Sequence, residues 1–490
     1  MTKSSSLAFR AAIAVALLIG FYALALAIAA ALAYIPYAEW TYAHRIHFKL
    51  AFGCVAGAAV ILWSIVPRID RFDPPGPELG PDRHPEMFRA IREVAERTKQ
   101  DPPASVYIVP EMNAWVAQRG GIMGIGSSRI MGIGLPLLQV TTTSQFKAIL
   151  AHEFGHYDGG DTSLGPWIYK TRAAIGRTLD NLGEDAWLQK PFMLYGRLFL
   201  RVTHAISRQQ EFNADSLSAR IYGRDAAIGG LKAVYGHAAS FHRYWYNEVA
   251  PVLDAGRKPP LTEGFRHFVS APLTAKAFAA ELDEEMKGRE TDPYDTHPGL
   301  AQRIEALNTL AARPLPKNDP PALDLLRDVP ELEAAMLASL SGGGTPDELK
   351  PITWGAVGSD IYLPYWEKQV AAHAALMRTM TAGAVADAAA DLSAFSGKLV
   401  RKDGPEATED ERKWAAASLL GAALAVTLHR KGWSLHALPG EEVLLKRQED
   451  TAAVEPFAAV RKLSDGSLQK EDWQRTCAEA GITDLPLCQG

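Results

Sequence analysis

The 490-residue sequence has few cysteines and little net charge. Its three cysteines are Cys54, Cys477 and Cys488, and Cys54 lies inside an apolar run. A disulfide-rich scaffold is therefore excluded. Only Cys477 and Cys488 are placed to pair, although two thiols near a C-terminus are more often free. The net charge of −5 gives no electrostatic reason to expect nucleic acid as a partner. The glycine-rich stretch 120–139 has neither a GxGxxG pattern nor a P-loop lysine, so no nucleotide-binding loop is indicated.

Near the N-terminus, two apolar stretches, residues 11–34 and residues 50–66, contain no charged residue. A helix rises ~1.5 Å per residue, so the first run can cross a ~30 Å hydrocarbon core and the second is near the lower limit. The first run is also longer than the ~7–15-residue apolar region of a cleaved signal peptide. The segment between the runs is rich in Tyr and Trp, as at a bilayer interface. We therefore predict a transmembrane helical hairpin in residues 1–68, with a buried core helix as the alternative for the second run.

The remaining sequence predicts a mainly α fold with a small β-sheet. Pro- and Gly-rich linkers at 69–85 and 313–345 delimit a domain at 86–312 and a mainly helical C-terminal domain at 346–490. Residues 105–109 read as a strand, and the stretch 120–139 looks like a short hairpin. Residues 163–222 read as helical but are interrupted by charges, so we expect no further span there. The uncharged run 414–428 is short and is interpreted as a buried helix.

The stretch ILAHEFGHYDGG (149–160) contains the pattern H-E-x-x-H. N-cap residues at 141–144 and the Gly159-Gly160 pair predict a helix between them. On a helix, His152 and His156 project from one face, so both imidazoles can reach one Zn²⁺ at ~2.0–2.1 Å. Glu153 lies one position further on and can contact a water at the remaining zinc position.

A catalytic zinc site needs a third protein ligand and an open position. Thr162 occupies the position where the metzincin pattern requires histidine as the third zinc ligand, so a metzincin site is excluded. Glu211 is the alternative, and Asp215, one turn further along, can accept a hydrogen bond from the second nitrogen of a ligand histidine. His204 competes as a ligand, but it lies ~10 Å from Glu211 along a helix, so the two cannot bind one ion. His204, Arg208, Glu211 and Asp215 recur at helical spacing, and such a row of polar residues is also typical of a solvated helix face.

Five segments occur in a fixed order: Asn113-Ala114-Trp115, GLPLLQ, AILAHEFGHYDGGD, SRQQEFNADSLSA and THPGLAQRI (296–304). Together they resemble the HtpX and type I CAAX prenyl protease family of membrane-associated zinc metallopeptidases, over about residues 75–312. The resemblance implies an α+β, zincin-like catalytic domain that binds one Zn²⁺ per chain. It implies zinc ligation by His152, His156 and Glu211, with Glu153 as general base and Asp215 as the acid supporting the ligands.

The resemblance also implies that His297 and Arg303 border the active site and hold substrate or transition state. The alternative interpretations are a helix-start residue and an ordinary surface arginine. The strand at Asn113–Trp115 is a candidate for binding substrate by β-augmentation, although Trp115 is equally interpreted as a core residue. HtpX-type enzymes usually have further spans between the two zinc motifs. The charged segment 163–201 does not match that pattern, so we expect the catalytic domain beside the membrane.

These observations predict a membrane-anchored zinc endopeptidase that cleaves protein or peptide substrates, with membrane protein quality control as a role and the lipid bilayer as a partner. We expect an integral protein of the bacterial inner membrane with its catalytic domain facing the cytoplasm. The alternative is a membrane-anchored scaffold or binding protein with a structural or inactive zinc site. The C-terminal third, which has no recognised catalytic motif, keeps that alternative open. An exopeptidase is a third reading. The sequence predicts no oligomeric state.

Overall fold

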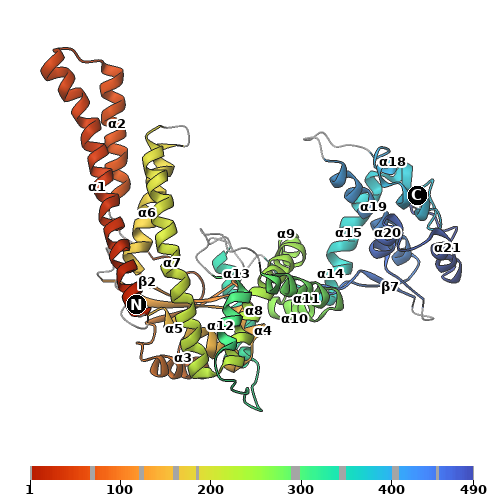
Figure 1. Ribbon diagram of the computed structural model, residues 1–490. Coiled ribbons are helices and arrows are strands. Elements are labelled where there is room, and N and C mark those ends of the chain that lie inside the picture. The colour runs from red at the N-terminus through yellow and green to blue at the C-terminus, as the bar shows by residue number, and fades with distance from the viewer. Residues whose placement is uncertain are drawn as a thin grey trace. The chain divides into compact units, whose positions relative to one another are not determined.

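The computed structural model describes residues 3–66, 72–120, 126–157, 165–183, 187–288, 298–340, 349–399, 408–447 and 452–488. The chain divides into two compact units. The first comprises Met1–Ala238 and Ala280–Gly342, and the second comprises Ala239–Ala279 and Gly343–Gly490. The predicted fold class is confirmed, because helices dominate both units and the sheets are small (Figure 1).

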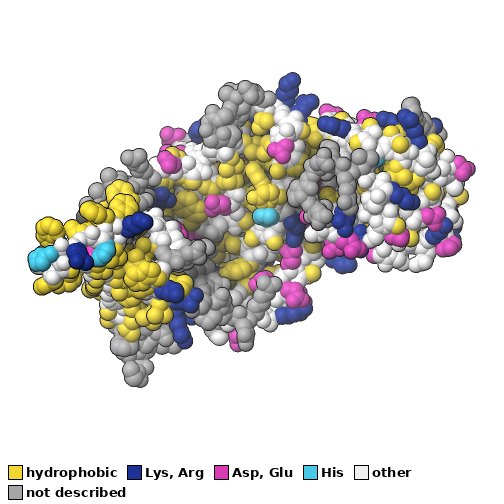
Figure 2. Space-filling model, turned by 90° about the horizontal axis from the view of Figure 1, so that it is seen from above, with side chains coloured by type: hydrophobic (Ala, Val, Ile, Leu, Met, Phe, Trp, Pro, Cys, Tyr) yellow, Lys and Arg dark blue, Asp and Glu magenta, His cyan; other side chains and the backbone are white. Residues whose placement is uncertain are grey.

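The N-terminal helices α1 (Lys3–Ala43) and α2 (Phe48–Ile65) form the predicted hairpin (Figure 1). By length and composition, Ala12–Ala43 and Phe48–Ile65 are each long and apolar enough to cross a membrane. Large apolar side chains point outward from the hairpin, with Phe48 83% exposed and Phe52 77% exposed. Figure 2 shows hydrophobic side chains covering this end of the unit. Such a surface is unfavourable in water and suits contact with lipid.

A second helix pair, α6 (Gly165–Leu182) and α7 (Gln189–Tyr222), packs along the hairpin. Phe21 of α1 is buried with Phe192 and Phe199 of α7. The Tyr195 hydroxyl donates a hydrogen bond of 2.6 Å to the Leu17 carbonyl. Among the described residues, α1 and α2 are the two candidate spans, and α6–α7 covers one side of them through these apolar and polar contacts.

Polar contacts also join α2 to α6. The Arg177 guanidinium donates to the Ser64 carbonyl at 3.2 Å, and the Asn181 amide donates to the Ser64 hydroxyl at 2.9 Å. These partners satisfy polar groups that would be costly to leave unpaired between packed helices. The charged residues of 163–201 are thus compatible with a helix pair that packs on the hairpin.

The first unit contains a three-stranded sheet made of β1 (Ser105–Val109), β2 (Ala114–Arg119) and β3 (Ser128–Gly134). The strand order is β1-β3-β2, with β1 parallel and β2 antiparallel to β3. Strand β2 is therefore an edge strand. The hairpin predicted within 120–139 instead begins at Ala114, and its turn includes residues outside the described ranges. The other elements that lie in this unit or reach into it are α3 (Pro85–Thr98), α4 (Leu135–Val140), α5 (Thr143–Gly155), α8 (Arg224–Tyr244), α11 (Pro272–Lys287), α12 (Leu300–Asn308), η3 (Ala322–Leu325) and α13 (Val329–Leu340).

Helix α5, which carries the H-E-x-x-H pattern, is fixed at its start by a capping box. The Gln145 side chain accepts a 3.0 Å hydrogen bond from the Thr142 N–H, and the Thr142 hydroxyl accepts from the Gln145 N–H. Along the helix, Phe146, Leu150 and Phe154 recur at i, i+4 and i+8 and are fully buried. One face of α5 is thereby anchored in the core, which leaves another face for polar side chains. The Gly159-Gly160 pair lies outside the described residues.

The second unit has its own core around α19 (Glu409–Arg430), where Leu419–Leu428 are buried. The uncharged run 414–428 lies inside this helix. Both Cys477 and Cys488 are free thiols. The unit's remaining elements are η2 (Trp245–Val249), α9 (Ala250–Asp254), β4 (Arg257–Lys258), α10 (Leu261–Ser270), β5 (Lys350–Pro351), α14 (Trp354–Val357), η5 (Gly358–Tyr362), α15 (Leu363–Ala372), α16 (Ala374–Met377), α17 (Val385–Ala390), α18 (Leu392–Ser396), β6 (Ser434–His436), β7 (Leu444–Lys446), β8 (Ala453–Val454), α20 (Pro456–Ser464) and α21 (Lys470–Glu479).

Residues 239–279 join this second unit, whereas the sequence suggests a boundary at 313–345. The physical reason is the burial of Trp354, whose indole N–H donates to the Pro260 carbonyl at 2.8 Å and whose ring lies 6.0 Å from that of Tyr244. Strand β5 also pairs with β4. The start of the C-terminal region is thus tied to residues 239–279 by apolar and backbone contacts.

Glu248 connects the two π-helical turns of this unit. Its carboxylate accepts hydrogen bonds from the Gly440 N–H at 3.2 Å and from the Tyr362 hydroxyl at 3.3 Å. Burial raises the pKa of Glu248, and the two hydrogen bonds offset part of that rise. The folded state therefore holds a proton at this carboxyl more tightly than the unfolded chain does.

We expect Glu248→Gln to flatten the pH dependence of stability of this unit. Because the folded pKa lies above the unfolded value, the free energy of unfolding falls as pH rises from about 4.5 through the raised pKa. The glutamine carbonyl oxygen can accept from the Gly440 N–H, and its amide N–H can donate to the Tyr362 hydroxyl oxygen, so both contacts are kept without an ionisable group and this loss should vanish. Hydrogen exchange of peptides covering Gly440 between about pH 4.5 and 8 measures it, with the exposed Glu263→Gln as control. An unchanged pH slope in the Glu248→Gln variant would contradict the assignment.

Candidate active site and metal centre

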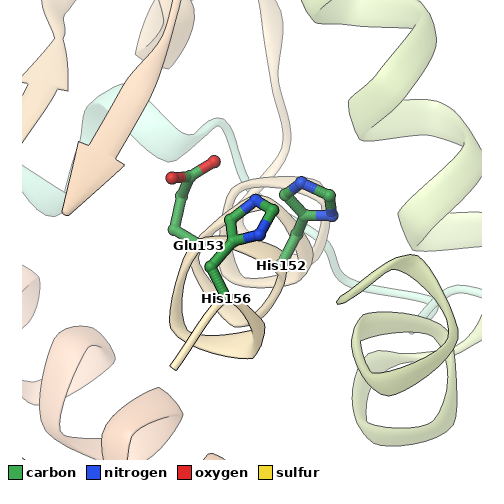
Figure 3. Close-up of side chains that lie close together, drawn as sticks. All are labelled: His152, Glu153 and His156. Atoms are coloured by element: carbon green, nitrogen blue, oxygen red, sulfur yellow. The ribbon is translucent and has the colours of Figure 1, made fainter. Parts of the chain in front are cut away.

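The polar residues of the H-E-x-x-H pattern lie at the C-terminal end of α5. His152 and Glu153 are in the last turn of the helix, and His156 is the residue that follows it, still with a helical backbone (φ −64°, ψ −16°). The two imidazole rings have centroids 4.8 Å apart. Figure 3 shows them side by side at the end of the helix, with the Glu153 carboxylate beside them. One nitrogen or oxygen from each of the three residues lies within 4.8 Å of the others.

Glu211 of α7 completes a set of three donors. Its carboxylate oxygens lie 3.5 Å from Nε2 of His152 and 3.6 Å from Nε2 of His156. Two ligands bound at ~2.0–2.2 Å to one tetrahedral zinc are separated by roughly 3.4 Å, so these spacings fit a shared Zn²⁺. Two neutral imidazoles and a carboxylate are also ligands that zinc prefers. The donor set therefore fits a zinc ion that keeps one position open.

Asp215 contacts His152 at Nδ1, the ring nitrogen that faces away from Glu211. Its Oδ1 lies 2.9 Å from Nδ1 of His152, so the imidazole donates through Nδ1 and directs Nε2 toward Glu211. Burial alone would lower the pKa of His152, but the hydrogen bonds to Asp215 and Glu211 raise it to about 9. Zinc binding must therefore displace a proton from this ring.

Arg303 of α12 is buried beneath the site, with 4% of its surface exposed. It donates a bidentate pair of hydrogen bonds to Asp215, from Nε to Oδ2 at 2.8 Å and from Nη2 to Oδ1 at 2.6 Å. Its Nη1 lies 3.1 Å from Oε2 of Glu211 and donates to the Tyr235 hydroxyl at 3.3 Å. Burial would raise the pKa of Asp215, but these hydrogen bonds, together with His152, lower it. The surface-arginine interpretation does not fit this burial.

Of the other candidates, His204 stands apart from this cluster. His204 is buried on α7 but does not line the cavity at the site. Its place seven residues before Glu211 keeps it from the same ion. His297 lies outside the described residues, as does Thr162. The structure thus brings together His152, Glu153, His156, Glu211, Asp215 and Arg303.

The edge strand β2 runs beside α5. The Asn113 carbonyl accepts from the Gly134 N–H at 2.8 Å, so Asn113, Trp115 and Ala117 direct their backbone groups toward β3. By alternation, Ala114 and Val116 direct theirs to the outer edge. The Val116 carbonyl accepts a 2.9 Å hydrogen bond from the Tyr157 hydroxyl. Tyr157 thus occupies the outer edge of β2 at Val116, and Ala114 is itself fully buried, so substrate pairing at this edge stays a prediction.

Asn113 and Trp115 differ in their surroundings. Asn113 lines the cavity that contains the zinc donors. Trp115 is half-buried and faces Gly132 across the strand pair, where an added Cβ would lie 2.4 Å from the indole. Gly132 thus leaves room for the ring on the face of the sheet, which fits the interpretation of Trp115 as a packing residue.

A cavity of about 290 Å³ contains the donor atoms and extends to α8. Its α8 wall was not identified from the sequence and comprises Ala227, Gly230, Leu231, Val234 and Tyr235. The signal available in the sequence is an apolar stripe at i, i+4 and i+7, which by itself is also the mark of an ordinary core-facing helix. Only the packing of α8 beside α5 distinguishes the two.

Comparison with known proteins gives matches to the catalytic region. Residues 81–311 match the family described as Peptidase family M48. A protein named Protease HtpX homolog from Aeropyrum pernix is 26% identical over 46% of this chain and 74% of its own length. Protease HtpX from Idiomarina loihiensis is 28% identical over 30% of this chain and 55% of its own length, and that from Haemophilus influenzae is 24% identical over 43% and 67%. No solved structure matches.

We expect Asp215→Asn to weaken zinc binding by about 10- to 100-fold while the protein stays folded, because the amide has a similar shape but loses the charge that holds His152 and pairs with Arg303. Competition with a chromogenic chelator measures the affinity of the purified full chain. Asp225→Asn, at a partly exposed position of α8, is the matched control. Equal zinc affinity in the wild type and the Asp215→Asn variant would show that Asp215 does not support the metal site.

Proposed function

Because the chain belongs to peptidase family M48 through residues 81–311, as the motif resemblance indicates, we propose that it is a membrane-anchored zinc-dependent endopeptidase. The observation that carries the proposal is the convergence of His152, His156 and Glu211 on one position with Glu153 beside it. A structural zinc site is closed by four protein ligands and needs no additional carboxylate at an open position. The presence of Glu153 therefore favours an enzyme over a scaffold with a structural zinc.

Bound zinc supplies a Lewis acid that polarises the scissile carbonyl and lowers the pKa of a bound water. Glu153 takes the proton from the attacking water and delivers it to the amine of the leaving fragment, so no net proton is lost. Asp215 keeps His152 in the tautomer that presents Nε2 to the metal. Arg303 acts on Asp215 and Glu211 and is a positioning residue in this scheme. A contact of His297 with substrate or transition state stays a prediction.

The substrate is a peptide in extended conformation. The strand at Asn113–Trp115 is the candidate for pairing with its backbone once Ala114, which is fully buried, is uncovered, and Asn113 lines the adjoining cavity. Backbone pairing does not require a free chain terminus, and no element of the site as described supplies a group that would capture one. These features support internal cleavage of proteins.

The membrane assignment is supported by the two apolar helices and by the names of the relatives. We place the protein in the bacterial inner membrane with its catalytic domain on the cytoplasmic side, because basic residues flank both ends of the hairpin. A peptidase anchored there would act on membrane-associated proteins, which fits a role in membrane protein quality control. The lipid bilayer is then a permanent partner.

We expect the detergent-purified full chain to cleave casein internally in the presence of zinc, and Glu153→Gln to reduce the rate by at least about 10²- to 10⁴-fold. Mass spectrometry of the fragments measures both the sites and the rates. Glu96→Gln, an exposed substitution on α3, should cleave as wild type does. Chelation should stop cleavage and added zinc should restore it. Equal fragmentation by the wild type and the Glu153→Gln variant would remove Glu153 from the chemistry.

A further inference from the structure

The side chain of Tyr157 lies against the outer edge of β2. Trp115 and Ala117 direct their backbone groups toward β3, so Val116 directs its carbonyl away from the sheet. The Tyr157 hydroxyl donates a 2.9 Å hydrogen bond to that carbonyl. A backbone N–H of an added strand would use the same acceptor, because strand addition joins N–H and carbonyl groups along a sheet edge. Tyr157 therefore occupies a position at which an extended peptide would pair.

The outer edge becomes more accessible toward the end of β2. Ala114 is fully buried and Val116 is half-buried, whereas Gln118 is exposed. The backbone groups of Gln118 also face outward, by the same alternation that turns those of Val116 away from β3. The stretch Val116–Gln118 is thus the part of the edge that a peptide can reach, and Tyr157 covers the carbonyl at its start.

The backbone at Tyr157 is held in place, so the edge is uncovered by movement of the side chain alone. Gly155, just before it, packs closely against α7. The Tyr157 N–H donates to the Phe154 carbonyl at 2.9 Å, and the Tyr157 carbonyl accepts from the Gln100 side-chain amide at 3.2 Å. Rotation of the ring about its side-chain bonds therefore opens the edge without displacing His156, the neighbouring candidate ligand.

The ring of Tyr157 is restrained by one further contact. The Arg129 guanidinium lies over it, with Cζ 4.5 Å from the ring centroid, and Nη1 of Arg129 donates to the Asp101 carbonyl at 2.7 Å. A cation–π contact and a neutral hydrogen bond each favour the closed position by only about 2- to 12-fold. A peptide that offers its own N–H to the Val116 carbonyl replaces the lost hydrogen bond, so it can compete with the ring.

We propose that Tyr157 is a latch on the substrate-binding edge: its side chain covers the Val116 carbonyl in the resting protein, and an extended peptide displaces it to pair with Val116–Gln118. This inference rests on the proposed function, because it assigns the regulation of the same site. The apparent affinity for a peptide is then the intrinsic affinity reduced by the fraction of molecules whose latch is open. Removal of the Tyr157 hydroxyl raises that fraction, so peptide binding becomes tighter although no contact is added.

Casein binding to the zinc-loaded full chain tests the latch without turnover. The parent protein carries Glu153→Gln, and fluorescence anisotropy of labelled casein gives the dissociation constant. Adding Tyr157→Phe removes the hydroxyl but keeps the ring, and it should tighten binding by about 3- to 10-fold. Tyr222→Phe removes a hydroxyl that contacts Glu93 elsewhere in the unit and should leave binding unchanged. Equal or weaker binding in the Tyr157→Phe protein, or no binding by either zinc-loaded chain, would overturn the latch.

Two further measurements distinguish a latch from a structural anchor. Competition with a chromogenic chelator should give equal zinc affinities for the parent and the Tyr157→Phe protein, because the backbone at His156 stays in place. Casein should slow hydrogen exchange of the peptide that covers β2, and at a fixed casein concentration the effect should be larger in the Tyr157→Phe protein. Weaker zinc binding with unchanged casein binding would identify Tyr157 as an anchor for His156 and overturn the latch.

The latch and the proposed function fail on different results. In the active chain, Tyr157→Phe should lower KM for casein by the same factor and leave kcat unchanged. If the wild type cuts casein but Tyr157→Phe brings no gain in binding, the latch fails and the peptidase stands. If Tyr157→Phe tightens casein binding but the wild type cuts no protein, the peptidase fails and the latch stands.

Discussion

The site depends on the close approach of helices α5 and α7. A Cβ at Gly155 would lie 3.0 Å from the Cα of Ala214, so only a small residue on each helix permits this contact. The hydrogen bond from Ser218 to the Ala148 carbonyl fixes the same pair of helices one to two turns further along. Because Glu211 and Asp215 flank Ala214 on α7, their carboxylates are carried to the imidazoles of α5. A wider spacing would separate the donors beyond the reach of a single zinc ion.

This approach gathers several charges in a nearly dry environment. Glu211, Asp215 and Arg303 are each at most 5% exposed at their side chains. An unpaired charge there would be strongly unfavourable, whereas the two-pronged pairing of Arg303 with Asp215 satisfies both groups. Arg303 also lies beside Glu211. The same guanidinium therefore restrains Glu211, a proposed ligand, and Asp215, the carboxylate that contacts the proposed ligand His152. The pairing of these groups offsets the free-energy cost of burying them. It also holds the candidate donors rigidly in place, as a metal site requires.

The packing on either side of the site connects it to the rest of the first unit. Helix α7 is 34 residues long, and it contacts the apolar hairpin near its start through Phe192 and Tyr195 and carries Glu211 and Asp215 nearer its end. One continuous helix therefore joins the hairpin to the candidate metal centre. Helix α8 forms the opposite wall of the cavity, and the boundary between the two units falls within it, after Ala238. Displacement of α7 would move the candidate donors, and displacement of α8 would change the shape of the cavity.

The sequence by itself determined the elements whose cause is local or periodic. Uncharged runs predict the two apolar helices, and the i, i+4 spacing of His152 and His156 places both rings on one helix face because the helix repeat is fixed. The ordered motifs indicate Glu211 and Asp215. Tertiary structure alone decided the burial of Arg303 and its pairing with Asp215, the assignment of 239–279 to the second unit, and the cavity wall that α8 forms. Each of these results from contacts between segments far apart in the chain, for which hydrophobic periodicity gives no partner. An apolar stripe on α8 predicts that the helix packs, but not that a gap beside a metal site remains open.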